Sequence, residues 1–412
     1  MNIAEKRARV EQKIAKLNQE TDLIAEKNQA KVLKSFNKNK VSDFHFNPST
    51  GYGYDDEGRD TLERVYADVF HTEHALVRPQ LISGTHAIST VLFGVLRPGD
   101  ELLYITGAPY DTLEAIVGIR GDGHGSLKEF NIGYQSVPLK NNEVDFERVS
   151  EKMTQKTKMI GIQRSKGYAS RKSFTVEQIE EMVCFVKKIN PHVIVFVDNC
   201  YGEFVEEKEP TDVGADIMAG SLIKNPGGGL AKIGGYIAGT HELIKLCGYR
   251  LITPGIGMEA GASLYSLLEM YQGFFLAPHV TAQAVKGARF TAALLSEFGI
   301  VSTPAWSDQR TDLIQSITFE DEKKMVAFAQ EIQAASPVNA HVLPVGAYMP
   351  GYADDVIMAA GTFIQGASLE LTADGPIRPP YELYVQGGLT YEHVKIAITQ
   401  AVCRLIEKKL LP

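Results

Sequence analysis

The chain has 412 residues, of which 44% are hydrophobic and 22% charged, and its net charge is −8. This length is too great for one compact core and predicts about two domains in a globular protein. The acidic balance excludes a general attraction to nucleic acid or to an anionic membrane, and no apolar run approaches the roughly 20 residues that span a bilayer.

The four cysteines are far apart in sequence and form no CxxC pair: Cys184, Cys200, Cys247 and Cys403. We therefore expect reduced thiols and a cytoplasmic location. The first residues are charged rather than apolar, so we expect no secretory signal.

Residues 1–36 are rich in lysine and glutamate, with Ile3, Val10 and Ile14 at roughly helical spacing. Residues 1–50 are therefore interpreted as a helical arm that lies across the main body or a partner subunit. A solvated helix is the alternative. Basic and acidic residues alternate along it, so we expect no role in binding nucleic acid.

A glycine-broken loop follows at residues 51–60. Its Tyr54 hydroxyl and Arg59 guanidinium are candidate donors to a phosphate group. The alternative is a plain loop in which Asp60 caps a helix that begins at Thr61.

Residues 76–81 are strand-like, and Ser83-Gly84-Thr85 opens a predicted helix that runs to about Leu96. The N-terminus of a helix presents free N–H groups to an anion, so Gly84, Thr85 and the backbone of His86 are candidate phosphate donors. The alternative is that Ser83 or Thr85 only caps the helix. We expect no metal site, because His86 has no His or Cys partner at ligand spacing.

Two more strands are predicted at residues 101–106 and 158–163, and each leads into a loop of interest. Tyr110 lies in the first loop. The second, residues 164–171, carries Arg164, Lys166 and Arg171. This basic loop is interpreted as a site for a substrate carboxylate, as a subunit contact or simply as an exposed charged loop.

The centre of the chain carries an acid and a lysine, each after a strand. Residues 193–197 form a fully apolar run that ends at Asp198, and a second strand-like run precedes Lys224. Ser221 stands three residues before this lysine, so a turn aims hydroxyl and amine into one pocket. The glycines at 227–229 let the backbone approach a ligand. This order of residues fits a site for a carbonyl cofactor.

These motifs, with Gly107-Ala108-Pro109-Tyr110, resemble the fold-type I pyridoxal phosphate (PLP) enzymes, and most closely the methionine gamma-lyase-like family often labelled aluminium-resistance proteins. The resemblance implies an α/β fold like that of aspartate aminotransferase. A large PLP-binding domain at residues 51–295, with a mainly parallel seven-stranded sheet, would precede a smaller α/β domain at 296–412. It also implies a homodimer or homotetramer.

In such enzymes the lysine, here Lys224, forms a Schiff base with PLP and then acts as the base at Cα, for which a depressed pKa is expected. Asp198 would keep the pyridine nitrogen protonated. Tyr110 would stack on the ring and assist proton transfer, and Ser221, Gly84 and Thr85 would hold the phosphate. Tyr54 and Arg59 would reach across a dimer to the neighbour's phosphate. Ile223 is a departure, since relatives usually have threonine before the lysine.

The implied reaction is elimination from a sulfur-containing amino acid to give thiol, ammonia and a 2-oxo acid, of either the β or the γ type. Arg378 is the candidate for the substrate carboxylate, or else a surface turn residue. An aminotransferase and a non-catalytic PLP-binding protein remain alternatives. A nicotinamide dehydrogenase is discounted, because no GxGxxG opens the first strand–helix turn.

Overall fold

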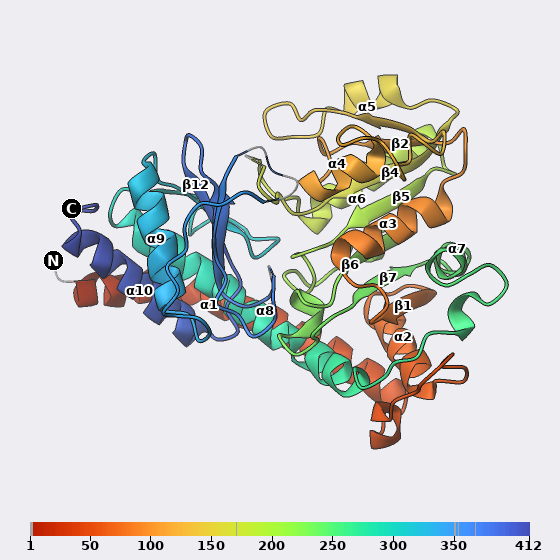
Figure 1. The fold of residues 1–412 in the computed structure, drawn as a ribbon, viewed down its shortest axis with the longest axis horizontal. Coiled ribbons are helices and arrows are strands. Elements are labelled where there is room, and N and C mark those ends of the chain that lie inside the picture. Colours follow the sequence, from red (N-terminus) through yellow and green to blue (C-terminus); the bar gives the residue numbers. More distant parts are fainter. Residues whose placement is uncertain (1–2, 170, 350–351, 353, 367) are drawn as a thin grey trace.

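The computed structural model describes residues 3–169, 171–349, 352, 354–366 and 368–412. Two sheets form separate lobes, and two long helices run beneath both of them (Figure 1). These helices are α1 (Ile3–Lys38) and α8 (Leu267–Ser296), which pack side by side. Both marked chain ends lie on the side of the smaller lobe.

The larger sheet has seven strands in the order β1-β7-β6-β5-β4-β2-β3, and only β7 runs antiparallel to its neighbours. This confirms the predicted seven-stranded, mainly parallel sheet. The strands are β1 (His74–Arg78), β2 (Glu101–Tyr104), β3 (Gly133–Ser136), β4 (Thr157–Gln163), β5 (Ile194–Asp198), β6 (Ile217–Ser221) and β7 (Gly235–Gly239).

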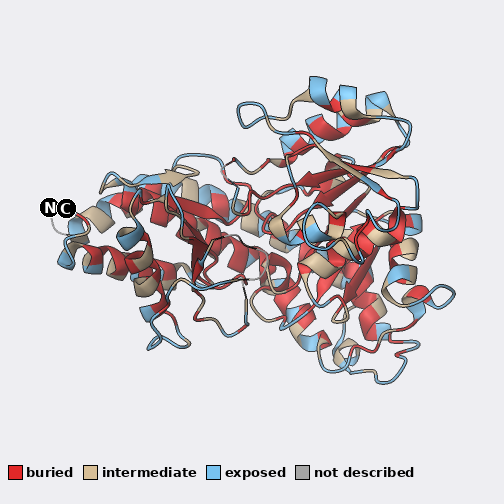
Figure 2. Cartoon of the chain, turned by 45° about the horizontal axis from the view of Figure 1, so that its top comes forward, coloured by how far each residue is buried: buried red, intermediate tan, exposed pale blue. Residues whose placement is uncertain are grey.

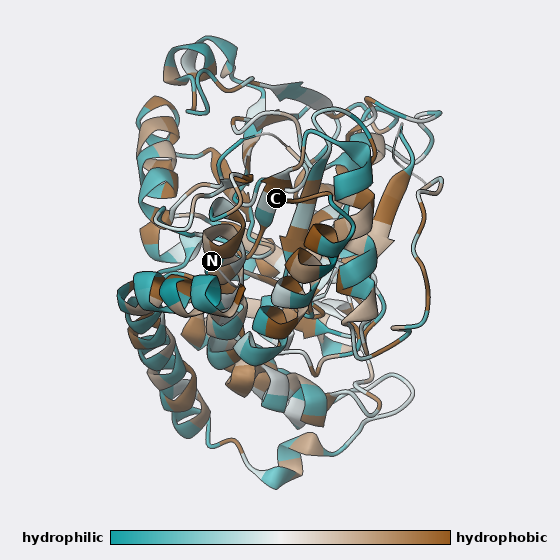
Figure 3. Ribbon diagram, turned by 90° about the vertical axis from the view of Figure 1, so that its left-hand side faces the viewer, coloured by the Kyte–Doolittle hydropathy of each residue, from teal (hydrophilic) through white to brown (hydrophobic). Residues whose placement is uncertain are grey.

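Helices cover both faces of this sheet, so its central strands are apolar on both sides. One face packs against α2 (Glu57–Val69), α6 (Val176–Ile189) and part of α8, with the short α5 (Phe146–Lys152) beside α6. The other packs against α3 (Gly84–Val95), α4 (Asp111–Val117) and α7 (His241–Leu251). The central strands are almost wholly buried in consequence (Figure 2). Most helices carry both hydrophilic and hydrophobic residues (Figure 3).

The smaller sheet is antiparallel, in the order β10-β11-β12-β9-β8. Its strands are β8 (Val301–Thr303), β9 (Gln315–Thr318), β10 (Val356–Ala359), β11 (Thr372–Pro376) and β12 (Glu382–Gln386). The helices α9 (Glu322–Ala334) and α10 (Tyr391–Glu407) pack with it in one core. The domain boundaries near residues 50 and 295 stay predictions.

The N-terminal helix α1 is held to both lobes along its length. Val10 and Ile14 are buried in the core of the smaller lobe, and Val32 is buried in that of the larger one. The Asn28 amide also donates hydrogen bonds to the carbonyls of Phe204 and Glu206, at 3.1 and 3.0 Å. This is the packing that the interpretation as an arm across the main body predicts.

The helix predicted from Thr61 begins earlier, at Glu57. Asp56, rather than Asp60, caps it by accepting a hydrogen bond from the Arg59 N–H at 2.9 Å. In the described part of the chain, no helix has the length and apolar character that a bilayer-spanning segment needs.

Candidate active site

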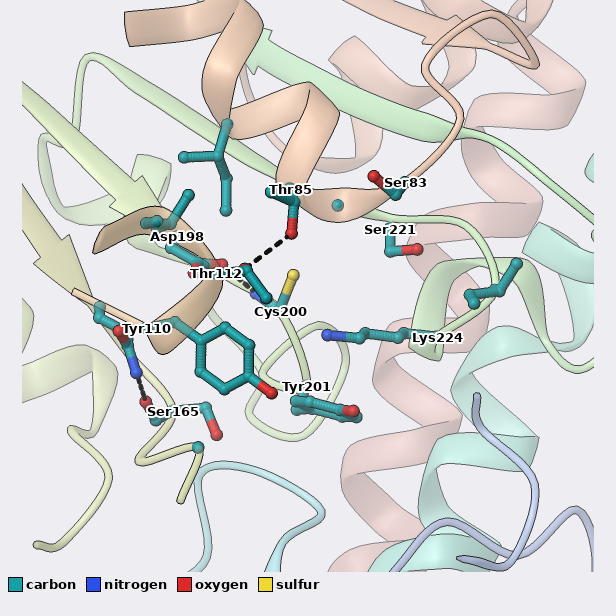
Figure 4. A pocket seen from close by; sticks show the side chains of 16 residues that line it. Ser83, Thr85, Tyr110, Thr112, Ser165, Asp198, Cys200, Tyr201, Ser221 and Lys224 are labelled. Carbon is teal, nitrogen blue, oxygen red and sulfur yellow. Dashed lines mark hydrogen bonds between the residues drawn. The ribbon is translucent and has the colours of Figure 1, made fainter. Parts of the chain in front are cut away.

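A cavity of about 730 Å³ lies where the carboxyl ends of β5 and β6 meet the N-terminus of α3. Crevices at the carboxyl ends of parallel strands are the usual ligand sites of such sheets. The side chains of Lys224 and Tyr110 reach into it from opposite sides, with Asp198 and Thr85 on the wall between them (Figure 4).

Lys224 enters the cavity from the turn that ends β6. The strand stops at Ser221, and the short helix η3 (Asn225–Gly227) starts directly after the lysine. Ser221 and Lys224 both line the cavity, as the spacing of three residues predicts. The Lys224 amine lies over the Tyr201 ring, 3.9 Å from its centroid, so the cation is partly stabilised by the aromatic face.

The three glycines after Lys224 have a different role from the predicted one. A side chain at Gly227 would collide with the Leu222 carbonyl, and one at Gly228 would collide with the Gly273 carbonyl of α8. Gly229 lies against Leu389. These glycines therefore allow the lysine-bearing turn to pack against its own chain rather than to approach a ligand.

The expectation of a depressed pKa for Lys224 is wrong for the amine in this structure. Burial by itself lowers the pKa of Lys224, but the acidic groups around it outweigh burial and raise the pKa above its ordinary value. These groups are Cys200, Tyr201, Asp198 and Glu203. The unbound amine is therefore an ammonium ion at neutral pH.

Asp198 is the last residue of β5, and its side chain is only 6% exposed. Burial raises the pKa of this carboxyl group, while Lys224 and the backbone N–H of Cys200, which donates to Oδ1 at 3.2 Å, oppose the rise. A buried carboxylate is stable only with a cationic or hydrogen-bonding partner. The site therefore suits a ligand that brings a protonated nitrogen to Asp198.

The N-terminus of α3 forms another part of the cavity wall. Gly84 and Thr85 line the cavity. A Cβ atom at Gly84 would come within 3.2 Å of Cys200 Sγ and Ser221 Cβ, so the glycine lets the helix begin close to the strand ends. The Thr85 hydroxyl lies 3.0 Å from that of Thr112.

His86 does not line this cavity. Its backbone N–H donates to the Ser83 hydroxyl at 3.0 Å, so the open alternative that Ser83 caps the helix is correct. The His86 ring accepts a hydrogen bond from the Ile82 N–H at 3.3 Å, and burial lowers its pKa. In this structure the internal cap uses that N–H, and its donation to a phosphate stays a prediction.

Tyr110 lies at the N-terminus of α4, and its hydroxyl is 3.1 Å from that of Tyr352, which precedes β10. Burial raises the pKa of Tyr110 well above its ordinary value, so its hydroxyl stays protonated at neutral pH. The side chain therefore offers a proton donor at the boundary between the two lobes.

Three further predicted residues lie outside this cavity. Tyr54 is exposed and stacks on Tyr52, with 5.5 Å between ring centroids. Arg59 is buried and donates to the carbonyls of Gly53 and Gly261, at 2.5 and 3.2 Å, so within its own subunit it holds a loop together. Arg378 pairs with Asp354 at 2.9 Å on the wall of an adjoining cavity. The roles assigned to these three residues stay predictions.

Sequence reasoning missed Cys200, Tyr201 and Gln163 as members of the site. The first two directly follow Asp198, and Gln163 ends β4 beside it, so their signal was their place at the same edge of the sheet. Tyr201 also has a φ of 69°, a strained conformation that is uncommon for residues other than glycine and is found most often at functional sites.

The residues of the cavity fit a PLP cofactor. The N-terminus of α3 at Gly84 and Thr85 lines the cavity and is a suitable place for a phosphate, Asp198 suits a protonated ring nitrogen, and the Lys224 amine faces the same space. Gln163 on the wall keeps a buried Oε1 atom with no hydrogen-bond partner among the described residues. A polar group of a bound ligand would satisfy it.

The fold is one that PLP-dependent proteins share. A solved structure of similar fold is the pyridoxal-5'-phosphate dependent protein YhfS of Escherichia coli, with a TM-score of 0.61, 16% identity and coverage of 92% of this chain and 96% of that one. The model of the methionine gamma-lyase family matches residues 3–406. The chain belongs to this family, which confirms the resemblance, and the family implies PLP and a lyase activity.

Two relatives are much closer in sequence. A solved structure from Listeria monocytogenes, named as a candidate cystathionine beta-lyase involved in aluminum resistance, is 77% identical with a TM-score of 0.96. The match covers 97% of this chain and 99% of the Listeria chain. The uncharacterized protein YnbB of Bacillus subtilis is 67% identical over 404 residues, which cover 98% of this chain and 96% of that protein.

Proposed function

We propose that the protein is a PLP-dependent carbon–sulfur lyase that releases a thiol from a sulfur-containing amino acid. The observation that carries the proposal is the position of Lys224 in one cavity with Asp198 and the N-terminus of α3. In the reaction a Cα proton is lost, the carbon–sulfur bond breaks, and the thiol leaves with a proton. Water then yields the 2-oxo acid and ammonia.

The residues of the cavity divide the chemistry among them. PLP, when bound, supplies an electron-withdrawing ring that makes the Cα proton of the substrate acidic. Lys224 would bind the cofactor through its amine and, once an incoming substrate amine displaces it in neutral form, would take the Cα proton as a general base. Asp198 would hold the ring nitrogen in its protonated form, and Gly84, Thr85 and Ser221 would orient the cofactor through its phosphate.

Tyr110 is the group that we assign to the departing sulfur. Its hydroxyl remains protonated at neutral pH because burial raises its pKa, so it can donate a proton to a leaving thiolate. Its ring also lies on the wall opposite Lys224, where it would pack against the cofactor.

We also propose that two copies of the chain assemble and complete each other's site. Three exposed apolar side chains, Leu264, Tyr265 and Leu268, lie on a segment that is bonded to the Tyr52 loop, since the Gly261 N–H donates to the Tyr52 carbonyl at 2.8 Å. Tyr52 and Tyr54 add two exposed rings to the same region. An apolar surface of this kind is typical of a subunit contact.

A product screen tests the proposed reaction. The cofactor-loaded protein is incubated with cystathionine, cysteine and methionine, and the released thiol (hydrogen sulfide from cysteine), ammonia and 2-oxo acid are measured together. We expect all three products in equal amounts without an added oxo acid. Transfer of the amino group to an added oxo acid, with no thiol released, would identify an aminotransferase instead. A protein that binds PLP and converts none of them would favour a non-catalytic role.

A further inference from the structure

A separate cavity, of about 930 Å³, lies beside the N-terminal helix α1 and has no described residue in common with the cavity of Lys224. Its wall comes from four segments, which lie within residues 17–24 of α1, 205–207 after β5, 285–289 of α8 and 307–310 before β9. Two arginines line it, Arg289 on α8 and Arg310 before β9. Segments of both lobes and of α1 therefore meet at two cationic side chains.

Both arginines are buried, since Arg289 is 6% exposed and Arg310 is 5% exposed. Arg289 donates through Nη1 to three acceptors on α1, namely the Leu17 carbonyl and the side chains of Asn18 and Thr21, at 3.1, 2.9 and 3.0 Å. Arg310 donates through Nη2 to the Gln315 side chain at 2.5 Å. All of these acceptors are neutral. Among the described residues, no carboxylate lies within ion-pair distance of either guanidinium group.

Three nitrogen atoms of these guanidinium groups are left without an acceptor in the described part of the chain, namely Nε of Arg289 and both Nε and Nη1 of Arg310. The two positive charges also act on each other. Burial, and after it the charge of Arg289, lowers the pKa of Arg310 to about 9. Water in the cavity would satisfy the N–H groups but would leave two buried charges without a counter-charge. An anion does both.

Four acids also line this cavity, namely Glu20, Glu206, Glu207 and Asp308. Two of them have cations of their own, because Glu206 pairs with Arg164 at 2.9 Å and Glu207 pairs with Lys27 at 2.7 Å. Glu20 and Asp308 are exposed. The cavity thus has a buried cationic part and an acidic rim, and such a rim repels a large polyanion more strongly than a small anion.

We propose that this cavity binds a small oxyanion, a carboxylate or a phosphate, between Arg289 and Arg310. A planar guanidinium group carries several N–H donors whose geometry matches the oxygens of such anions. The bound anion would stabilise the contact of α1 with α8 and with the segment before β9. The site is separate from the cavity of Lys224, so the inference does not rest on the proposed lyase function.

Thermal unfolding of the PLP-loaded protein tests the site. Sodium acetate and sodium phosphate are the probes, and sodium chloride at equal ionic strength is the reference. An anion that binds only the folded chain should raise Tm by about 2 °C at ten times its Kd in a chain of this size. A rise with acetate alone identifies a carboxylate site, and a rise with phosphate alone identifies a phosphate site. No rise above chloride with either probe would overturn the proposal.

Arg310→Gln assigns the rise in Tm to this cavity. Glutamine can still bond to Gln315 but carries no charge, so we expect the rise to be lost. Arg404→Gln is the matched control, because Arg404 is 53% exposed in a pair with Glu407 and its replacement should leave the rise unchanged. An equal rise in Arg310→Gln and in the parent would show that the anion binds elsewhere.

Glu20→Gln gives a test of opposite sign that does not disturb a buried group. Burial lowers the pKa of Arg289, and the negative charge of the exposed Glu20 opposes the fall, so Glu20 competes with an anion for this cation. We expect the variant to bind the anion about two- to fivefold more tightly, the effect of one partly exposed charge pair. The anion concentration at half of the maximal rise in Tm measures this change.

Glu26→Gln is the control for Glu20→Gln, because Glu26 is exposed on the same helix but does not line the cavity. It should leave the concentration at half of the maximal rise as in the parent. If Glu20→Gln and Glu26→Gln gave the same value, the anion would lie out of reach of Arg289 and the proposal would be wrong.

Discussion

Replacement of Lys224 by alanine is expected to abolish elimination, with a loss in kcat on the order of 10⁴-fold or more, as for other residues that act as both nucleophile and base. The methyl side chain can neither bind the cofactor carbonyl nor take the Cα proton. The yellow colour of the lysine-bound cofactor should also be lost. Turnover assays and an absorbance spectrum of the purified variant check both expectations.

The control is Lys232→Ala. Lys232 lies eight residues along the chain, is 73% exposed and pairs with Glu269, so its removal should change neither colour nor turnover. A Lys224→Ala protein with the colour and activity of the parent would show that another amine holds the cofactor.

Replacement of Asp198 by asparagine is expected to lower kcat by about 100- to 1000-fold, the range seen when one electrostatic group is removed from an active site. The buried carboxylate is the only anion on the cavity wall in the described residues, and asparagine cannot keep a ring nitrogen protonated. Affinity for PLP should fall as well, because one partner of a buried charge pair is lost. Steady-state kinetics and a PLP titration measure the two effects.

The control for Asp198→Asn is Asp321→Asn. Asp321 caps α9 by accepting a hydrogen bond from the Lys324 N–H at 2.9 Å, and asparagine caps a helix equally well. The change should therefore leave kinetics and PLP affinity as they were. If Asp198→Asn behaved like this control, the carboxylate would have no part in the chemistry.

The presence of Lys224 and Asp198 in one cavity could be predicted because Asp198 ends one buried strand and Lys224 follows another, and the carboxyl ends of neighbouring parallel strands meet at one edge. The seven-stranded sheet could be predicted from the resemblance to the family. The antiparallel sheet of the smaller lobe was harder to predict. Strand β8 has only three residues, β10 is apolar but has only four, and β11 consists of small and polar residues, so none of them shows a clear strand pattern in the sequence.

Side-chain partners were the least predictable feature. An arginine is a suitable donor to a phosphate, which made Arg59 a candidate. In its own subunit, however, the Arg59 guanidinium donates hydrogen bonds to the carbonyls of Gly53 and Gly261. The raised pKa of Lys224 likewise depends on acidic groups gathered from the loop after β5, and burial alone predicts the opposite direction. Such effects depend on neighbours that only the folded chain brings together.

The central claim is that one lysine holds the cofactor, and borohydride reduction tests it most directly. The cofactor-loaded protein is reduced and digested, and its peptides are analysed by mass spectrometry. We predict a pyridoxyl phosphate group on Lys224 in nearly every molecule. A group found on a different lysine, or no covalent group at all in a protein that still eliminates thiol, would contradict the account.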